Sequence, residues 1–150
     1  MIVTVATMAE FLTNVTATGK TFDPANTYIL LYSAIDNQGQ GTTIGDVTPC
    51  VGGLAGAESV EGYGSPAIRT DGSMYVEAEE CDWITSDSGD AQSVAGYCWT
   101  AGTEPGVLLG FTPFNPPLNI PYPYGRIGII PILVLTAAGL TDDSYVWSNT

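Results

Sequence analysis

The chain contains no histidine, and this absence removes several classes of catalytic and metal-binding chemistry. Serine and cysteine nucleophiles of the triad type depend on a neighbouring imidazole, so Ser-His-Asp and Cys-His mechanisms are excluded. Cysteine is scarce as well: Cys50, Cys81 and Cys98 form no CxxC pair, which argues against a zinc site. We expect buried free thiols, with one disulfide of undefined pairing as the alternative.

Basic residues are almost as rare. Lys20, Arg69 and Arg126 face sixteen acidic residues, which gives a net charge of −13. Binding to nucleic acid requires lysine and arginine side chains to displace counterions, and anionic membranes attract the same residues. The most apolar run, 127–135, is nine residues long, whereas a membrane-spanning helix needs about 20. We therefore expect no nucleic-acid partner, no membrane partner, and a buried strand at 127–135.

Motifs for phosphate, dinucleotide, serine-hydrolase and metalloprotease chemistry are also missing from the sequence. A glycosidase needs only two carboxylates, and the densest acidic group is Glu77, Glu79, Glu80 and Asp82. We interpret this group as a solvated strand edge rather than a catalytic or cation site. The pairs Asp87 and Asp90, and Asp142 and Asp143, lack the spacing of a calcium loop and suit turns. We expect a protein that is not an enzyme and holds no cofactor or metal.

The residues that are present favour one all-β domain over positions 1–150. Glycine (18) and proline (10) separate short runs of β-branched and aromatic residues. Strands are expected at 2–7, 27–35, 93–101 and on both sides of the turn "TDGS", with a short edge strand at 42–47. Pro131 should place the closing strand at an edge or create a bulge. The pattern predicts a β-sandwich or barrel-like domain with extended arms and loops and little helix, apart from a short helical spacing at 8–15.

The segment "FTPFNPPLNIPYPYG" (111–125) holds five prolines and four aromatic rings. It could be a ligand strip or a polyproline recognition motif, but such motifs usually lie in disordered tails beside a basic residue. We interpret it as a stiff extended arm that contacts another subunit, because a rigid segment loses little entropy on docking. The tail, 137–150, is expected either to be flexible or to pack against a neighbour. The candidate intersubunit residues are Phe111, Phe114, Pro116, Pro117, Tyr122, Tyr124, Tyr145 and Trp147.

Several short motifs occur in the order found in a known group of proteins. They are "TNV", "YILLYS", "GYGSPAI", "CDWI", "VAGYCWTAGTEPGVLLGF" and the final "IGIIPILVL". Over residues 12–135 this order resembles a group of small structural proteins of tailed phages. The matching positions are Gly62, Tyr63, Trp83, Gly96, Tyr97 and Leu109. The chain departs from the pattern in the nearly missing helix after "TNV", in the glycine-rich segment 49–64 and in the proline content of 111–125.

The resemblance implies an all-β virion component, in particular a capsid decoration (cement) protein. Such a protein would bind the major capsid protein or other virion proteins and associate with itself, commonly as a trimer. A neck, tail or baseplate component is the alternative within the virion. A secreted carbohydrate-binding module is the alternative outside it, because Trp83, Trp99 and Trp147 could stack on sugars.

Overall fold

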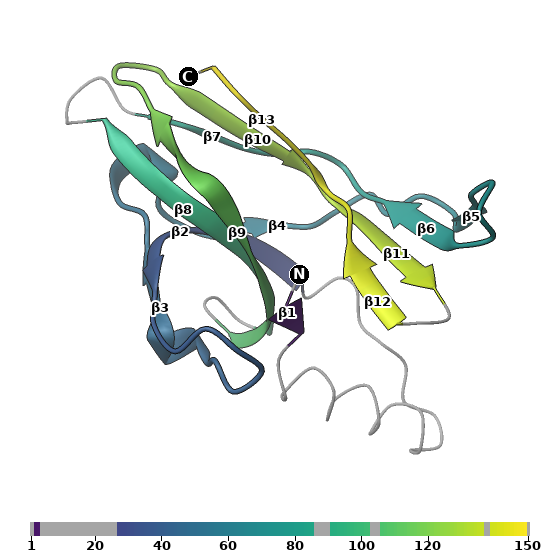
Figure 1. The fold of residues 1–150 in the computed structure, drawn as a ribbon. Coiled ribbons are helices and arrows are strands. Elements are labelled where there is room, and N and C mark those ends of the chain that lie inside the picture. Colours follow the sequence, from purple (N-terminus) through teal and green to yellow (C-terminus); the bar gives the residue numbers. More distant parts are fainter. Residues whose placement is uncertain (1, 4–26, 86–90, 103–105, 137–138, 150) are drawn as a thin grey trace.

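The computed structural model describes residues 2–3, 27–85, 91–102, 106–136 and 139–149, and these form an all-β fold. Figure 1 shows two sheets packed on each other and a third sheet that projects from them. The elements are β1 (Ile2–Val3), β2 (Thr27–Ile35), β3 (Val47–Pro49), β4 (Glu58–Ser59), β5 (Ala67–Ile68), β6 (Met74–Glu77), β7 (Cys81–Ile84), β8 (Gln92–Ala101), β9 (Val107–Ile120), β10 (Arg126–Ile130), β11 (Ile132–Thr136), β12 (Gly139–Asp142) and β13 (Tyr145–Ser148), with 3-10 turns η2 (Ile44–Asp46) and η3 (Gly52–Leu54).

The largest sheet, with the order β1-β9-β8-β2-β3 and β4 beside β2, is built on two strands that are apolar on both faces. In β2, Ile29 and Leu31 enter one hydrophobic cluster while Leu30 and Tyr32 enter another, as period-two alternation requires. The expected strands at 27–35 and 93–101 are therefore confirmed. The expected strand at 42–47 is wrong, because η2 occupies residues 44–46 and the strand β3 begins only at Val47.

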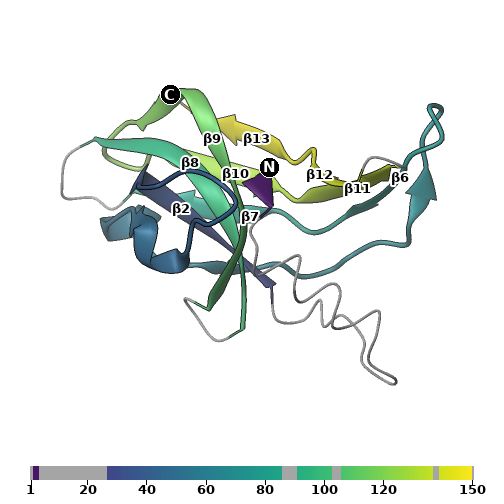
Figure 2. The same cartoon turned by 60° about the horizontal axis from the view of Figure 1, so that its bottom comes forward.

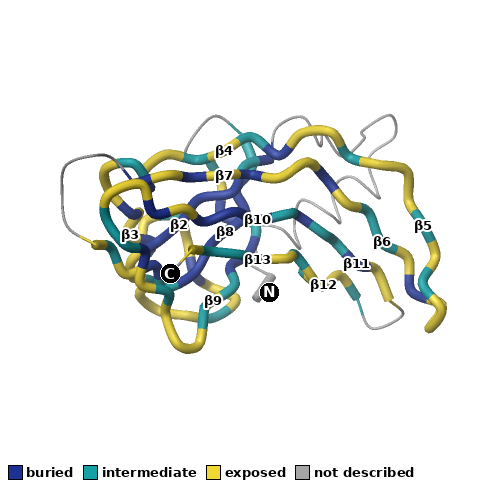
Figure 3. The backbone as a smooth tube through the Cα atoms, turned by 90° about the horizontal axis from the view of Figure 1, so that it is seen from above, coloured by how far each residue is buried: buried dark blue, intermediate teal, exposed yellow. Residues whose placement is uncertain are grey.

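The main core lies between this sheet and the three-stranded sheet β13-β10-β7. Inward side chains of β7 and β10, among them Trp83, Ile127 and Ile129, pack against Tyr97 and Trp99 of β8. Figure 3 shows the buried segments concentrated where these two sheets overlap. The arrangement is a β-sandwich, as the strand pattern predicts.

The four-stranded sheet, β12-β11-β6-β5, forms an arm that extends beyond the sandwich (Figures 1 and 2). It continues the three-stranded sheet, since the chain passes between the two sheets at 78–80, at Pro131 and at 143–144. Hydrogen bonds bridge the junction from Ala78 N to Pro131 O (2.9 Å) and from Ile132 N to Ser144 Oγ (2.9 Å). The expected single strand at 127–135 is thus two strands in two sheets, separated at Pro131, which has no N–H to donate.

Two expectations about extended segments need correction. Most of the segment 111–125 is not a free arm, because residues 111–120 belong to β9, which pairs with β8 at 111–113 and at 118–120. The described part of the tail, 139–149, forms β12 and β13, paired with β11 and β10. The expected hairpin around "TDGS" is confirmed by the pairing of β5 with β6. The expected helical spacing at 8–15 lies outside the described residues.

All three cysteines are free and buried, as expected. Burial raises the pKa of Cys50 to about 11 and, as the largest cause, those of Cys81 and Cys98 to about 12. We expect a thiol reagent such as DTNB to leave the native protein unlabelled near pH 8 and to label three thiols after unfolding. Fast labelling of the native chain would contradict the burial.

The same thiols make the free energy of unfolding decrease at alkaline pH. Each thiol is neutral in the folded chain up to its raised pKa, whereas the unfolded chain releases the proton near its ordinary pKa of 9.0. The unfolded state therefore binds fewer protons above that pH, and the free energy of unfolding falls by up to about 1.4 kcal/mol per pH unit per thiol. Urea titrations between pH 8 and 11 should show this decline, and a Cys98→Ala variant should show a shallower one.

Candidate interaction surface

The structure separates the eight candidate contact residues by burial. Phe111 is completely buried in the second hydrophobic cluster, beside Tyr32 and Cys98, so its side chain is not available to another subunit. Its assignment as an intersubunit contact is therefore wrong, because β9 is a central strand at this position, with β1 on its other edge. Phe114 is half-buried and packs on the main core, with its ring centroid 5.7 Å from that of Tyr97.

Pro116 and Pro117 are exposed and lie in a bulge of β9. The ladder with β8 runs from Gly96↔Pro113 to Val94↔Leu118, so β9 carries three more residues than β8 over this interval. Proline cannot donate to a ladder and is tolerated at bulges and edges. The prolines therefore mark an irregular strand edge that is protected against further pairing, not a polyproline helix.

Tyr122 and Tyr124 belong to the turn between β9 and β10. Thr85 anchors this turn: its Oγ1 donates to Pro121 O (3.1 Å) and accepts from Gly125 N (2.7 Å). Tyr124 has a positive φ of 58° and a residue exposure of 58%, whereas Tyr122 is half-buried. The turn thus holds one exposed aromatic ring at the end of the three-stranded sheet.

Tyr145 and Trp147 lie two residues apart on β13 and share the outer face of this sheet, away from the core. Tyr145 is 60% exposed. Trp147 pairs with Gly128 of β10, and any side chain at that position would collide with the indole, so the glycine lets the ring lie against the strand. The indole Nε1 donates to Glu80 Oε1 (2.9 Å).

Arg126 completes the surroundings of the indole. Its guanidinium lies 5.6 Å from the Trp147 ring centroid and forms an ion pair with Asp82. In the acidic group at 77–82, Glu80 therefore positions Trp147 and Asp82 positions Arg126. The other two members, Glu77 and Glu79, are exposed. No cluster of three metal-ligating side chains occurs within the described residues.

The structure brings together only part of the set that the sequence suggested. Tyr124, Tyr145 and Trp147 belong to one sheet and its end turn, whereas Pro116 and Pro117 lie on the edge of the other sheet. Ile84, 47% exposed and opposite Arg126, extends the outer face and was not anticipated. The alternation of "CDWI" could have identified Ile84 as exposed, because Cys81 and Trp83 are buried and Ile84 lies on the opposite face of the strand. We call Ile84, Arg126, Tyr145 and Trp147 the outer aromatic face.

Trp83 and Trp99 do not contribute to any surface. Both are buried, with Trp83 Nε1 donating to Gly56 O (3.2 Å) and Trp99 Nε1 donating to Asp142 Oδ2 (3.1 Å). Of the three tryptophans, only Trp147 is placed to meet a ligand. Among the three tryptophans, a sugar-binding surface could therefore use only Trp147, on the outer aromatic face.

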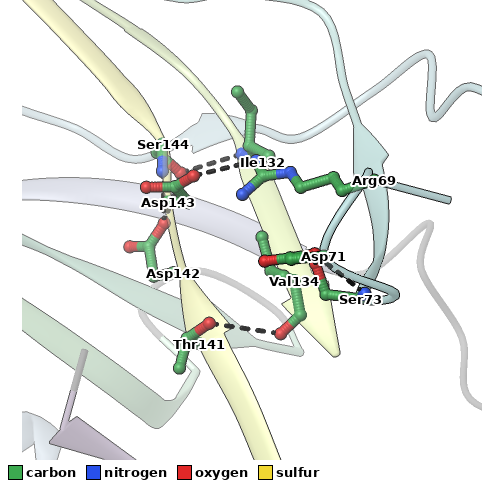
Figure 4. A network of polar contacts seen from close by, with 9 residues as sticks. All are labelled: Arg69, Asp71, Ser73, Ile132, Val134, Thr141, Asp142, Asp143 and Ser144. Carbon is green, nitrogen blue, oxygen red and sulfur yellow. Dashed lines mark hydrogen bonds and ion pairs between the residues drawn. The ribbon is translucent and has the colours of Figure 1, made fainter. Parts of the chain in front are cut away.

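Asp142 and Asp143 serve separate internal contacts instead of forming a calcium pair (Figure 4). The Asp142 carboxylate accepts hydrogen bonds from Tyr97 Oη (2.6 Å), from Trp99 Nε1, from Thr112 Oγ1 (3.2 Å) and from Ser144. Burial, followed by the Asp142 charge, raises the pKa of Tyr97 well above its ordinary value. Asp143 pairs with Arg69 at 2.8 Å on the opposite side of the strand. Asp87 and Asp90 lie outside the described residues.

Comparisons with known proteins identify no relative of this chain. No family model, no curated protein and no solved structure matches it. Among the described residues, no helix has the length and apolar character to cross a membrane. The chain's own surfaces are accordingly what indicates its function.

Proposed function

We propose that this protein is a structural component of a tailed-phage virion, and specifically a capsid decoration protein that binds the outside of the shell. In this proposal the protein acts by binding rather than by catalysis. Its partner is the major capsid protein, and it also associates with itself to form a trimer. The observation that carries the proposal is the outer aromatic face: a rigid sheet presents Tyr145, Trp147 and Ile84 outward on a strongly acidic domain.

The rigidity of this face supports a binding role. Hydrogen bonds and ion pairs from Glu80 and Asp82 position Trp147 and Arg126 before any partner arrives. A preorganised aromatic and arginine surface loses little side-chain entropy on association, and these residue types dominate binding energy at protein interfaces. The acidic remainder of the chain would keep the virion exterior from adhering to nucleic acid.

The test is a copy count. Virions purified from the source would be analysed for the 15.7 kDa chain relative to the major shell protein. Abundance comparable to the shell protein is the expected result for a decoration protein, because it binds all over the outside of the shell. A few copies per particle would move the protein to the neck, tail or baseplate, and its absence from virions would refute the proposal.

A secreted carbohydrate-binding module is the second candidate, and one observation favours it. Tyr145 and Trp147 share a face, with the Glu80 carboxylate bonded to the indole, an arrangement that could stack on a sugar ring and bind its hydroxyls. Screening against a glycan array separates this candidate from the first. Binding that is lost in Trp147→Ala but retained in Trp99→Phe would establish it.

A further inference from the structure

The arm presents an apolar face that the sandwich covers only at its base. Along β10 and β11, alternate side chains from Ile127 and Ile129 through Pro131 and Leu133 to Leu135 share one side of the sheet. Ile127 and Ile129 are fully buried against the large sheet and Leu133 packs on the same core, whereas Leu135 is 57% exposed. The core-facing side of this ribbon therefore continues past the end of the sheet that covers it (Figure 3).

The exposed part is a single row across all four strands of the arm. The pairing registers place Ile68 opposite Met74, Met74 opposite Leu135, and Leu135 opposite Leu140. Directly opposite residues in antiparallel strands project from the same face. Their exposures are 72% for Ile68, 43% for Met74, 57% for Leu135 and 40% for Leu140. We call these four residues the apolar row.

The other face of the arm is covered by its own side chains. Val134, 4% exposed, lies there with Tyr75, and the Arg69 guanidinium lies 5.0 Å from the Tyr75 ring centroid. Arg69 in turn pairs with Asp143 (Figure 4). The two faces of one sheet thus differ: one has a polar cover from the same chain, and the other presents aliphatic side chains to solvent.

Charge decides which kind of partner fits the apolar row. The core-facing side of the arm carries one charged residue, Asp142, whose carboxylate is already bonded to Tyr97, Trp99 and Thr112. A cationic partner would gain nothing at this position, although the other fifteen of the chain's sixteen acidic residues lie elsewhere. The complementary surface is uncharged and aliphatic, and the same row of a second copy has that composition.

We infer that the apolar row is a self-association surface, on which two copies pack row against row about a two-fold axis. Such a contact is isologous, so each copy supplies the same four side chains. The row exposes roughly 400 Å², which is within the range of the largest apolar patches on monomers. Two rows together would bury about 800 Å², at the low end for specific interfaces, so a weak and reversible pairing is expected.

This contact goes beyond the proposed function, because it does not depend on binding to a capsid. It would join two copies of the chain in addition to any other contact that the chain makes in an assembly. The experiment is sedimentation equilibrium of the full chain across a concentration series, compared with Leu135→Glu and with Met74→Thr/Leu135→Thr. Threonine preserves strand propensity, so the double variant guards against misfolding. Val107→Glu and Val107→Thr are the matched controls, since Val107 is 52% exposed on β9 of the large sheet and belongs to neither surface.

The expected result is a wild-type mass that approaches twice that of both row variants at high concentration, while the Val107 variants behave like wild type. Added NaCl should strengthen pairing, because each copy carries −13 and screening reduces their repulsion. Equal masses for wild type and row variants, or a ratio other than two, would overturn the inference. These outcomes are independent of the copy count in virions, so the two proposals can fail separately.

Discussion

Replacing Asp142 by alanine is expected to lower the free energy of unfolding by roughly 3–4 kcal/mol, because two buried donors lose their acceptor at a cost of about 1–3 kcal/mol each. Those donors are Tyr97 Oη and Trp99 Nε1, and both side chains are no more than 3% exposed. For a chain of 150 residues this corresponds to a decrease in Tm of roughly 6–16 °C. Thermal unfolding followed by tryptophan fluorescence would measure it.

The adjacent carboxylate supplies the control. Asp143→Ala removes an exposed ion pair with Arg69 and should cost less than about 1 kcal/mol. Asp142→Asn should also destabilise strongly, because an amide offers one acceptor oxygen where the carboxylate uses two. A double-mutant cycle with Tyr97→Phe should show a coupling energy above about 1 kcal/mol. Equal effects of Asp142→Ala and Asp143→Ala would show that the network does not hold the arm to the sandwich.

Gly96→Ala is expected to be the most damaging single methyl addition among the described residues of β8. A Cβ atom at this position would lie inside the contact distance of Tyr32 Oη and of the backbone oxygen of Thr112. The Thr112 oxygen belongs to the adjoining strand, so relief requires movement of β9. Overpacking of this kind costs about 1–3 kcal/mol and more where backbone must shift, so we expect about 3 kcal/mol in a urea titration.

Gly41→Ala is the matched control, since nothing lies within 4 Å of a Cβ there. Tyr32→Phe tests the mechanism, because the Tyr32 hydroxyl is buried without a hydrogen-bond partner. Its removal alone should be neutral or stabilising, and in the Gly96→Ala background it should restore part of the lost stability. If Gly96→Ala unfolds at the same urea concentration as Gly41→Ala, the close packing of Tyr32 on Gly96 is refuted.

The sequence predicts the parts of this fold that local pattern controls. The strands β2 and β8 are runs of apolar residues that are long enough to indicate buried strands, and Asp71-Gly72 marks the β5–β6 hairpin directly. The sequence could not show that Pro131 divides "IGIIPILVL" between two sheets. The residues before and after Pro131 are equally apolar, so composition does not distinguish one long strand from two. It also could not show that β12 and β13 pair within the chain, since their partners are fixed by tertiary packing.

The candidate site was predictable to a similar degree. Aromatic and proline content identifies Tyr124, Tyr145 and Trp147 as candidates. The same criterion selects Phe111, which is buried. What separates them is the register of β9 against β8 and β1, which no spacing rule reveals. The sequence favours a turn at Asp142, whereas its bonding to three side chains of the large sheet depends on contacts 30–45 residues away in sequence.

The junction at Pro131 also determines how the molecule carries mechanical load. Three chain segments pass through it side by side, joined by the hydrogen bonds from Ala78 to Pro131, from Ile132 to Ser144 and from Asp143 to Ile132. A force on the tip of the arm is therefore shared among three strands and transmitted to the ladders of β10 with β7 and β13. When the arm is pulled along its axis, these ladders are loaded in shear, so many hydrogen bonds resist the force together. The arm is therefore rigidly attached to the sandwich at its base and does not swing as a hinged flap would.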